Sequence, residues 1–134
     1  MPAIIDVEGI GPKYAEKLKK VGIKTTEKLL KDGATPAGRK AIEEKSGIGH
    51  ELLLKWVNNA DLYRIKGVGS EYAELLEAAG VDTVVELGKR VPKNLVESMA
   101  EANKKHKMVR RLPVLKEVVK WVDQAKKLPR VISY

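Results

Sequence analysis

The 134-residue sequence contains no cysteine and no phenylalanine, and it has only two histidines. Without cysteine the chain can form no disulfide, no thiol nucleophile and no thiolate metal site. The two histidines, His50 and His106, are too few for most metal cages and are predicted to lie on the surface. The sequence therefore predicts neither a metal nor a cofactor. The aromatic residues predicted to join Leu, Val and Ile in the core are Tyr14, Tyr72, Trp56 and Trp121.

Long apolar runs are also missing from this chain. No stretch approaches the roughly 18 apolar residues that a membrane-spanning helix needs. The opening "MPAIIDVEG" has no basic leader followed by an apolar run, so the sequence gives no sign of a secretory signal. We therefore expect a soluble, cytoplasmic protein with no membrane partner, associated with the nucleoid if it binds DNA.

Acidic residues are scarce toward the end of the chain. The net charge is +8 and the isoelectric point about 9.6. Residues 104–130 contain ten basic residues and only two acidic ones, Glu117 and Asp123. Such a basic segment indicates a polyanionic partner, with nucleic acid first among them. The alternative is that these charges simply solvate the exposed faces of helices.

The sequence repeats itself. "VEGIGPKYAEKLKKVGIKT" starts at Val7, and "IKGVGSEYAELLEAAGVDT" starts at Ile65. With Gly9 aligned on Gly67, nine of 21 positions are identical, and "KWVNNADL" is later echoed by "KWVDQAKKL". The repeat predicts two related units, 1–61 and 62–134.

The periodicity is helical throughout, with no sustained alternation of apolar and polar residues. Helix-capping threonines and first-turn prolines mark several starts, such as Thr35-Pro36 and Thr83-x-x-Glu86. Glycine stops the first helix at Gly22. The fold class is therefore all-α, built from short helices. The predicted segments run from Tyr14 to Val21, from Thr25 or Thr26 to Leu30, and over 35–45, 50–60, 70–79, 83–89, 92–105 and 114–127.

Three Gly-apolar-Gly turns, at 9–11, 47–49 and 67–69, each precede a helix. The first amides of a helix lack partners inside it, and the helix dipole adds a partial positive charge there. Glycine permits positive φ and leaves room for a ligand. Such a turn can bind a phosphate oxygen, with the middle residue (Ile10, Ile48 or Val68) packed inward. The alternative is a turn that only joins two helices.

These stretches, "EGIGPKYAEKL", "SGIGHELLLKW" and "KGVGSEYAELL", resemble the helix-hairpin-helix family. The resemblance implies compact SAM-like units of paired hairpins, in tandem here, that hold DNA phosphates without reading sequence. The expected fourth hairpin, "MVRRLPVL" from Met108, lacks glycine and departs from the pattern. Residues 63–128 also resemble a bacterial family of unknown function of the same hairpin type, especially in "VRRLP" and "KWVDQAKKL".

The turns differ in their expected affinity for phosphate. Turn 67–69 ranks first because of its cationic neighbours, and turn 47–49 is intermediate. Turn 9–11 is weaker, since Pro12 lacks an amide hydrogen and Asp6 and Glu8 repel phosphate. At the fourth position two arginines could bind phosphate through bidentate contacts. The predicted DNA-binding residues are Arg64, Lys66, Gly67, Val68, Gly69, Ser70, Gly47, Ile48, Gly49, Gly9, Ile10, Gly11, Lys13, Arg110 and Arg111.

Lys13 raises the question of catalysis. It lies two residues after the second glycine, where glycosylases of the helix-hairpin-helix superfamily carry a catalytic lysine that can form a Schiff base. The downstream aspartate of that family cannot be placed in this sequence, and Glu71 stands at the equivalent position of the second repeat. We therefore predict a non-enzymatic protein that binds DNA without sequence specificity. The alternative is a protein-interaction or scaffold module that uses the same fold.

Overall fold

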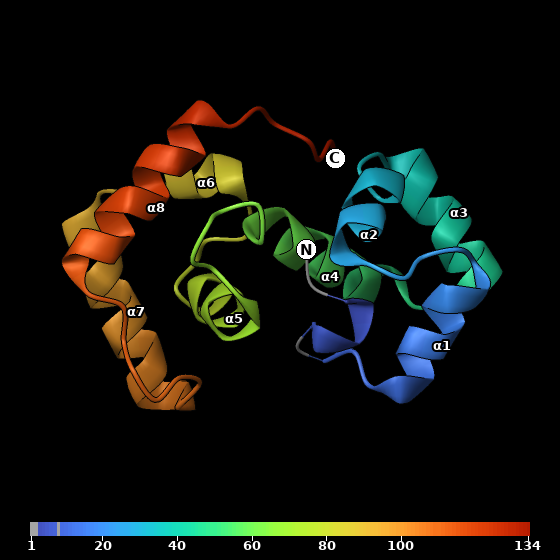
Figure 1. The fold of residues 1–134 in the computed structure, drawn as a ribbon, viewed down its shortest axis with the longest axis horizontal. Helices are drawn as coiled ribbons and strands as arrows, with labels where there is room; N and C mark the ends of the chain where they lie inside the picture. Colours follow the sequence, from blue (N-terminus) through green and yellow to red (C-terminus); the bar gives the residue numbers. More distant parts are fainter. Residues whose placement is uncertain (1–2, 8) are drawn as a thin grey trace. The chain divides into compact units, whose positions relative to one another are not determined.

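The computed structural model describes residues 3–7 and 9–134, and within these ranges the secondary structure is helical without a strand (Figure 1). This confirms the predicted all-α class. A 3-10 helix, Ile4–Asp6, comes before the α-helices. These are α1 Pro12–Lys20, α2 Thr26–Asp32, α3 Pro36–Ser46, α4 His50–Leu62, α5 Ser70–Ala78, α6 Val84–Gly88, α7 Pro92–His106 and α8 Leu115–Lys127.

The chain divides into two compact units. Unit 1 comprises Met1–Asp61 and Val131–Tyr134, and unit 2 comprises Leu62–Arg130. Unit 2 is thus one continuous insertion, because the chain leaves unit 1 at the end of α4 and returns to it after α8. The predicted second unit, 62–134, differs from the observed one at its last four residues.

A buried arginine explains why the last residues belong to unit 1. Arg39, on α3, is only 3% exposed. Its Nη1 donates to the carbonyl of Gly33 at 2.9 Å, and its Nη2 donates to the carbonyl of Ser133 at 2.8 Å. The Ser133 amide in turn donates to the carbonyl of Ala34 at 2.8 Å. A charged donor with two backbone acceptors thus anchors residues distant in sequence.

The helices begin where their capping residues place them. The hydroxyls of Thr25 and Thr35 accept hydrogen bonds from amides three residues further on, at 3.1 and 3.0 Å. Thr83 accepts from the Glu86 amide at 3.4 Å. Each of these bonds satisfies a donor that the helix itself leaves unpaired. Between the two residues left open by the sequence, Thr25 is the cap of α2.

Both repeats use the same glycine turn. Gly9 and Gly67 have φ angles of 88° and 98°, a region that side chains with a Cβ rarely adopt. The carbonyl of Val7 accepts from the Ile10 amide at 3.0 Å, and that of Ile65 accepts from the Val68 amide at 3.1 Å. A positive φ at the third position is what a type II turn requires. The turn therefore fixes glycine at this position in both units.

A tryptophan lies under each turn. Trp56 and Trp121 are 0% and 3% exposed, as predicted for core residues. Each packs against a tyrosine of its own unit, with ring centroids 5.1 Å apart for Tyr14–Trp56 and 5.3 Å apart for Tyr72–Trp121. A Cβ on Gly67 would lie 3.0 Å from the indole nitrogen of Trp121. Gly67 is therefore needed for space as well as for its φ angle, whereas a Cβ on Gly9 would lie at an ordinary contact distance of 3.5 Å from the Trp56 indole nitrogen.

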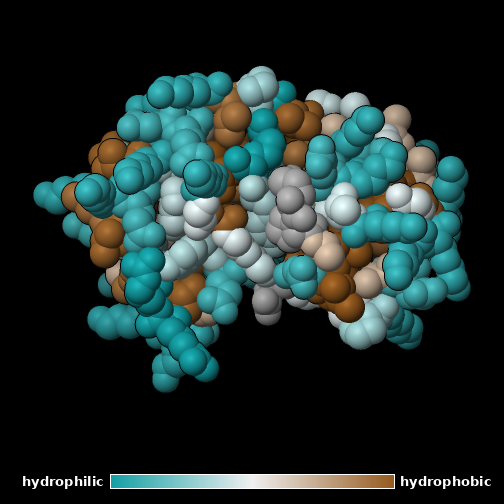
Figure 2. Space-filling view, viewed as in Figure 1, coloured by the Kyte–Doolittle hydropathy of each residue, from teal (hydrophilic) through white to brown (hydrophobic). Residues whose placement is uncertain are grey.

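In unit 2, α8 packs on α6 and α7, and α5 packs on α7. In unit 1, α3 packs on α1 and α2. Hydrophilic side chains cover most of the face shown in Figure 2. The glycines of the three turns are exposed on these helical units.

We expect Gly67→Ala to destabilise the protein more than Gly80→Ala. Gly80 also has a positive φ, 93°, but a Cβ there would meet only the flexible end of Arg90 at 3.7 Å. The Gly80 variant should lose about 1–2 kcal/mol of unfolding free energy from backbone strain alone. The Gly67 variant should lose roughly 1 kcal/mol more because Trp121 must move. Urea unfolding of both variants measures the difference, and equal losses would mean that the tryptophan does not constrain the turn.

Candidate anion-binding surface

Turn 67–69 opens directly onto the start of α5. Gly69 is the N-cap, and no side chain in the described part of the protein caps this helix. The first backbone bond of the helix runs from the Ala73 amide to the Gly69 carbonyl at 2.9 Å, so the amides before it have no acceptor within the helix. A Cβ on Gly69 would meet no described atom within 4 Å. The middle residue, Val68, is buried at 5% exposure, as predicted.

Lys66 is held in place by its backbone. Its amide donates to the Oε1 of Gln124 at 3.0 Å, and its carbonyl accepts from the Nε2 of Gln124 at 3.4 Å. Gln124 lies on α8, one turn after Trp121. The side chain of Lys66 is exposed beside the turn, whereas Arg64 is half-buried. The exposed cation of this pair is therefore Lys66.

The two arginines of the α7–α8 loop belong to the same region. The Tyr72 hydroxyl, in the first turn of α5, donates to the carbonyl of Arg111 at 3.0 Å. Arg110 is exposed and makes no ion pair with any residue that the structure describes. The structure thus brings the start of α5, Lys66 and the 110–111 segment together within unit 2.

Arg111 does not offer a free guanidinium, contrary to the sequence-based expectation. Its Nη1 and Nη2 donate to the two carboxylate oxygens of Glu117 at 2.9 and 3.0 Å. The Glu117 Oε1 also accepts from the Val114 amide at 3.1 Å. A phosphate at the start of α8 would have to compete with a carboxylate that already occupies both donors. The sequence shows both residues but not that they pair.

This pairing shifts the ionisation of both groups. The hydrogen bonds from Arg111, and then from the Val114 backbone, lower the pKa of Glu117. The hydrogen bond to Glu117, followed by its negative charge, raises the pKa of Arg111. Both side chains are accessible to solvent, so the pair contributes little to stability. Its main effect is that both terminal nitrogens of Arg111 are already bound and are not available to an anion.

Turn 47–49 is partly satisfied by its own side chains. Gly47 has a φ of 75° and ends α3, and the Ile48 amide donates to the Ser46 hydroxyl at 3.2 Å. Ile48 is buried, whereas Gly49 is exposed and a Cβ on it would meet no described atom within 4 Å. The His50 ring lies on the surface and bonds Glu43 at 3.1 Å. Ser46 thus consumes one of the donors of this turn.

Turn 9–11 keeps the disadvantages visible in its sequence. Pro12 is the first residue of α1 and has no amide hydrogen. Ile10 is buried, Gly11 and Lys13 are exposed, and Asp6 is exposed nearby in sequence. Glu8, expected to repel phosphate, lies outside the described residues. Both α1 and α5 start without a side-chain cap and have an exposed cation nearby, Lys13 or Lys66. Turn 67–69 differs in that the residue after its last glycine is Ser70 rather than proline and keeps its amide hydrogen.

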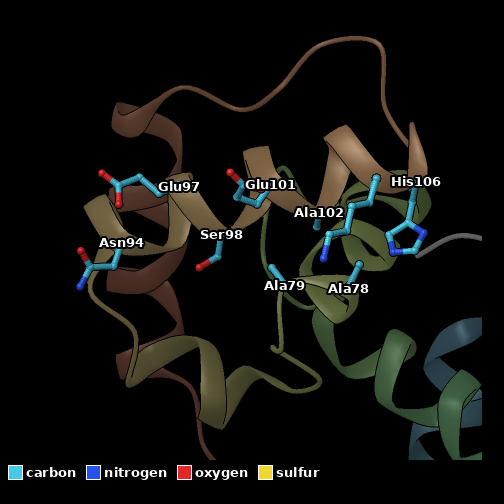
Figure 3. A pocket seen from close by; sticks show the side chains of 9 residues that line it. Ala78, Ala79, Asn94, Glu97, Ser98, Glu101, Ala102 and His106 are labelled. Carbon is cyan, nitrogen blue, oxygen red and sulfur yellow. The ribbon is translucent and has the colours of Figure 1, made fainter.

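A groove of about 410 Å³ lies between the end of α5 and α7 in unit 2 (Figure 3). Small residues line it on both sides, Ala78 and Ala79 at the end of α5 and Ala102 on α7, and Glu97 and His106 lie toward opposite ends of α7. Across the described residues, no three His, Cys, Asp or Glu side chains are grouped to hold a metal. None of the helices in residues 3–7 and 9–134 is long and apolar enough to span a membrane.

We expect the Glu117 carboxyl to titrate at a lower pH in the wild type than in Arg111→Gln, because the variant removes the main cause of its lowered pKa. As the pH falls through that pKa, the carboxylate is protonated and the pair is lost. NMR titration of the side-chain carboxyl carbon measures both midpoints. Arg110→Gln is the matched control and should leave the midpoint near the wild-type value. A midpoint that ignores Arg111 would show that the pair does not form in solution.

One protein family matches this chain over most of both units, and not over the second unit alone. A family model described as a domain of unknown function, DUF4332, matches residues 8–128. No match was found among curated proteins or among solved structures. The matched segment includes the three glycine turns and the helices that follow them, both tryptophans and the α7–α8 loop. It therefore covers most of both units. The chain therefore belongs to the DUF4332 family.

Proposed function

We propose that this protein binds the phosphate backbone of DNA without reading its sequence, through units of the helix-hairpin-helix type. The observation that carries the proposal is the uncapped start of α5, with exposed Gly69 in front of it and exposed Lys66 beside it. Backbone amides at such a site can bind one phosphate oxygen, and Lys66 and Arg110 add charge. The protein acts as a binding module rather than an enzyme, and we place it in the cytoplasm on the nucleoid.

The contribution of each turn follows from its own contacts. Turn 67–69 provides the main phosphate site. Turn 47–49 contributes less because Ser46 accepts the Ile48 amide, and turn 9–11 contributes least because Pro12 replaces a donor. Arg111 takes part only when a phosphate displaces Glu117. Unit 2 is therefore the principal DNA-binding unit.

A protein-interaction role is the second candidate. It is favoured by unit 1, where the donors of turn 47–49 are partly satisfied internally and His50 bonds Glu43. A unit that needs no anion at its turns can serve as a docking scaffold. Retrieval of one defined partner from nuclease-treated extract, together with absence of DNA binding, would favour this role over the first.

We expect the affinity for duplex DNA to fall steeply with salt. If about three phosphates are neutralised, the slope of log K against log salt should be near −3. Fluorescence anisotropy with two unrelated duplexes, measured at several salt concentrations, gives the slope and tests sequence independence. No binding at about 50 mM salt, or a slope near zero, would refute the proposed function.

Charge reversal should weaken binding only near the start of α5. Lys66→Glu and Arg110→Glu should each lower the affinity for any duplex by roughly tenfold and make the salt slope shallower by about one or more. Lys93→Glu, an exposed lysine at the start of α7, is the matched control and should lose less than about threefold. Glu117→Gln should instead raise the affinity, because it releases Arg111 for phosphate. Equal losses for all three lysine and arginine variants would mean that only net charge matters.

A further inference from the structure

Among the described residues, the exposed large apolar side chains are concentrated in one stretch of the sequence. Among the described residues seven large hydrophobic side chains are exposed, and four of them fall between residues 112 and 119. We call these four residues the 112–119 patch: Leu112 (38% exposed), Val114 (54%), Leu115 (48%) and Val119 (38%). In Figure 2, apolar surface breaks through the hydrophilic side chains over the part drawn as α7 and α8 in Figure 1. Exposed apolar patches of this kind mark protein or membrane contacts.

The loop that carries the patch is fixed in position. The side-chain amide of Asn103 exchanges two hydrogen bonds with the backbone of Val109, at 3.2 and 3.0 Å. Tyr72 bonds the carbonyl of Arg111, and Glu117 accepts the backbone amide just before α8. These contacts hold the backbone on both sides of Leu112. The aliphatic side chains are therefore held in solvent by a fixed backbone rather than exposed by a loose loop.

The duplicated fold does not require these aliphatic residues. Aligning Trp121 on Trp56 pairs α8 with α4 and the patch with its counterpart in unit 1. The four corresponding residues are Gly47, Gly49, His50 and Leu54. The first three are exposed and not aliphatic, and Leu54 is half-buried. Unit 1 thus builds the same helix start without an apolar surface, which indicates that the patch serves a purpose other than folding.

The patch is surrounded by positive charge. Between residues 104 and 120 the sequence has one carboxylate, Glu117, and it is bound to Arg111. Besides Arg111, the exposed cations of this segment are Lys104, Lys105, Lys107, Arg110, Lys116 and Lys120. A second copy of the patch would bring like charges together, which disfavours self-association through it. Duplex DNA supplies negative charge but is contacted mainly at its phosphates and sugars, where aliphatic side chains gain little.

An anionic bilayer surface matches both properties. Its headgroups attract lysine and arginine, and the boundary with the acyl chains accepts aliphatic side chains. We propose that the 112–119 patch inserts into the surface of membranes rich in anionic phospholipid, with Lys116 and Lys120 at the lipid phosphates. This differs from our sequence-based expectation of no membrane partner, which considered only a spanning segment. It is also independent of DNA binding at the start of α5, although both use cations of unit 2.

The test is co-sedimentation of the full-length protein with vesicles containing about 30% phosphatidylglycerol in phosphatidylcholine. We expect binding to these vesicles and at least tenfold weaker binding to pure phosphatidylcholine. The double variant Leu112→Ser/Leu115→Ser should lose about tenfold in partitioning into the anionic vesicles. Val91→Ser is the matched control because Val91 is 57% exposed in unit 2 but outside the patch, and it should bind like the wild type. Circular dichroism confirms that both variants fold.

Three results would overturn the inference. One is no sedimentation with anionic vesicles at about 50 mM salt, which would leave an acidic protein surface as the occupant. Another is unchanged binding of the double variant, which would mean that lysines alone attract the vesicles. The third is an equal loss of DNA affinity in the double variant, which would assign the patch to the DNA site. Retained DNA affinity together with lost vesicle binding supports the inference and separates it from the proposed function.

Discussion

In each unit of this protein a glycine with a positive φ angle lies against the edge of a buried tryptophan, and the rest of the unit is built around this contact. At Gly67 the indole nitrogen of Trp121 would lie 3.0 Å from an added Cβ, and at Gly9 that of Trp56 would lie 3.5 Å away. A Cβ on Gly67 would therefore force Trp121 to move, whereas at Gly9 the distance is an ordinary contact and the positive φ angle is what favours glycine. The same helix that supplies Trp121 supplies Gln124, which bonds the backbone of Lys66. One contact thus sets the turn, the start of α5 and the position of the neighbouring cation.

The duplication separates what the fold requires from what each unit adds. Both units keep the glycines at positive φ, the tyrosine–tryptophan pair and the capping threonine. They differ at the start of the helix that carries the tryptophan. Unit 1 has Gly49 there, whereas unit 2 has Val114 with its amide bound by Glu117. In unit 2 the start of this helix is thus closed by the protein's own carboxylate.

Sequence reasoning predicts this fold well because its signals are local. Thr35, Thr83 and the prolines at helix starts fix the boundaries within a few residues, and the repeat shows which glycines are structural. It fails where contacts span a loop or the whole chain. Nothing in the sequence pairs Arg111 with Glu117, and nothing places Ser133 on Arg39. For the candidate site, residue types rank turn 67–69 first, but only the three-dimensional structure shows which of its neighbours already have hydrogen-bond partners.

The exposure of the patch is a further example of this limit. Leu115 and Val119 continue the apolar stripe of α8, so a helical pattern alone assigns them to the core. They lie in solvent because α6 and α7 cover only part of that stripe. Whether these two side chains are buried depends on where the neighbouring helices run. That is set by the tertiary structure and cannot be deduced from the helical pattern of α8 alone.

The contact between Arg39 and the Ser133 carbonyl also delays the completion of unit 1 during synthesis. Residues 131–134 leave the ribosome only after all of unit 2 has been translated. Until then the guanidinium of Arg39 lacks one of its two backbone acceptors, although α3 and its neighbours have long been available to fold. In a nascent chain the first unit therefore lacks this contact. The contact can form only after the second unit has been translated.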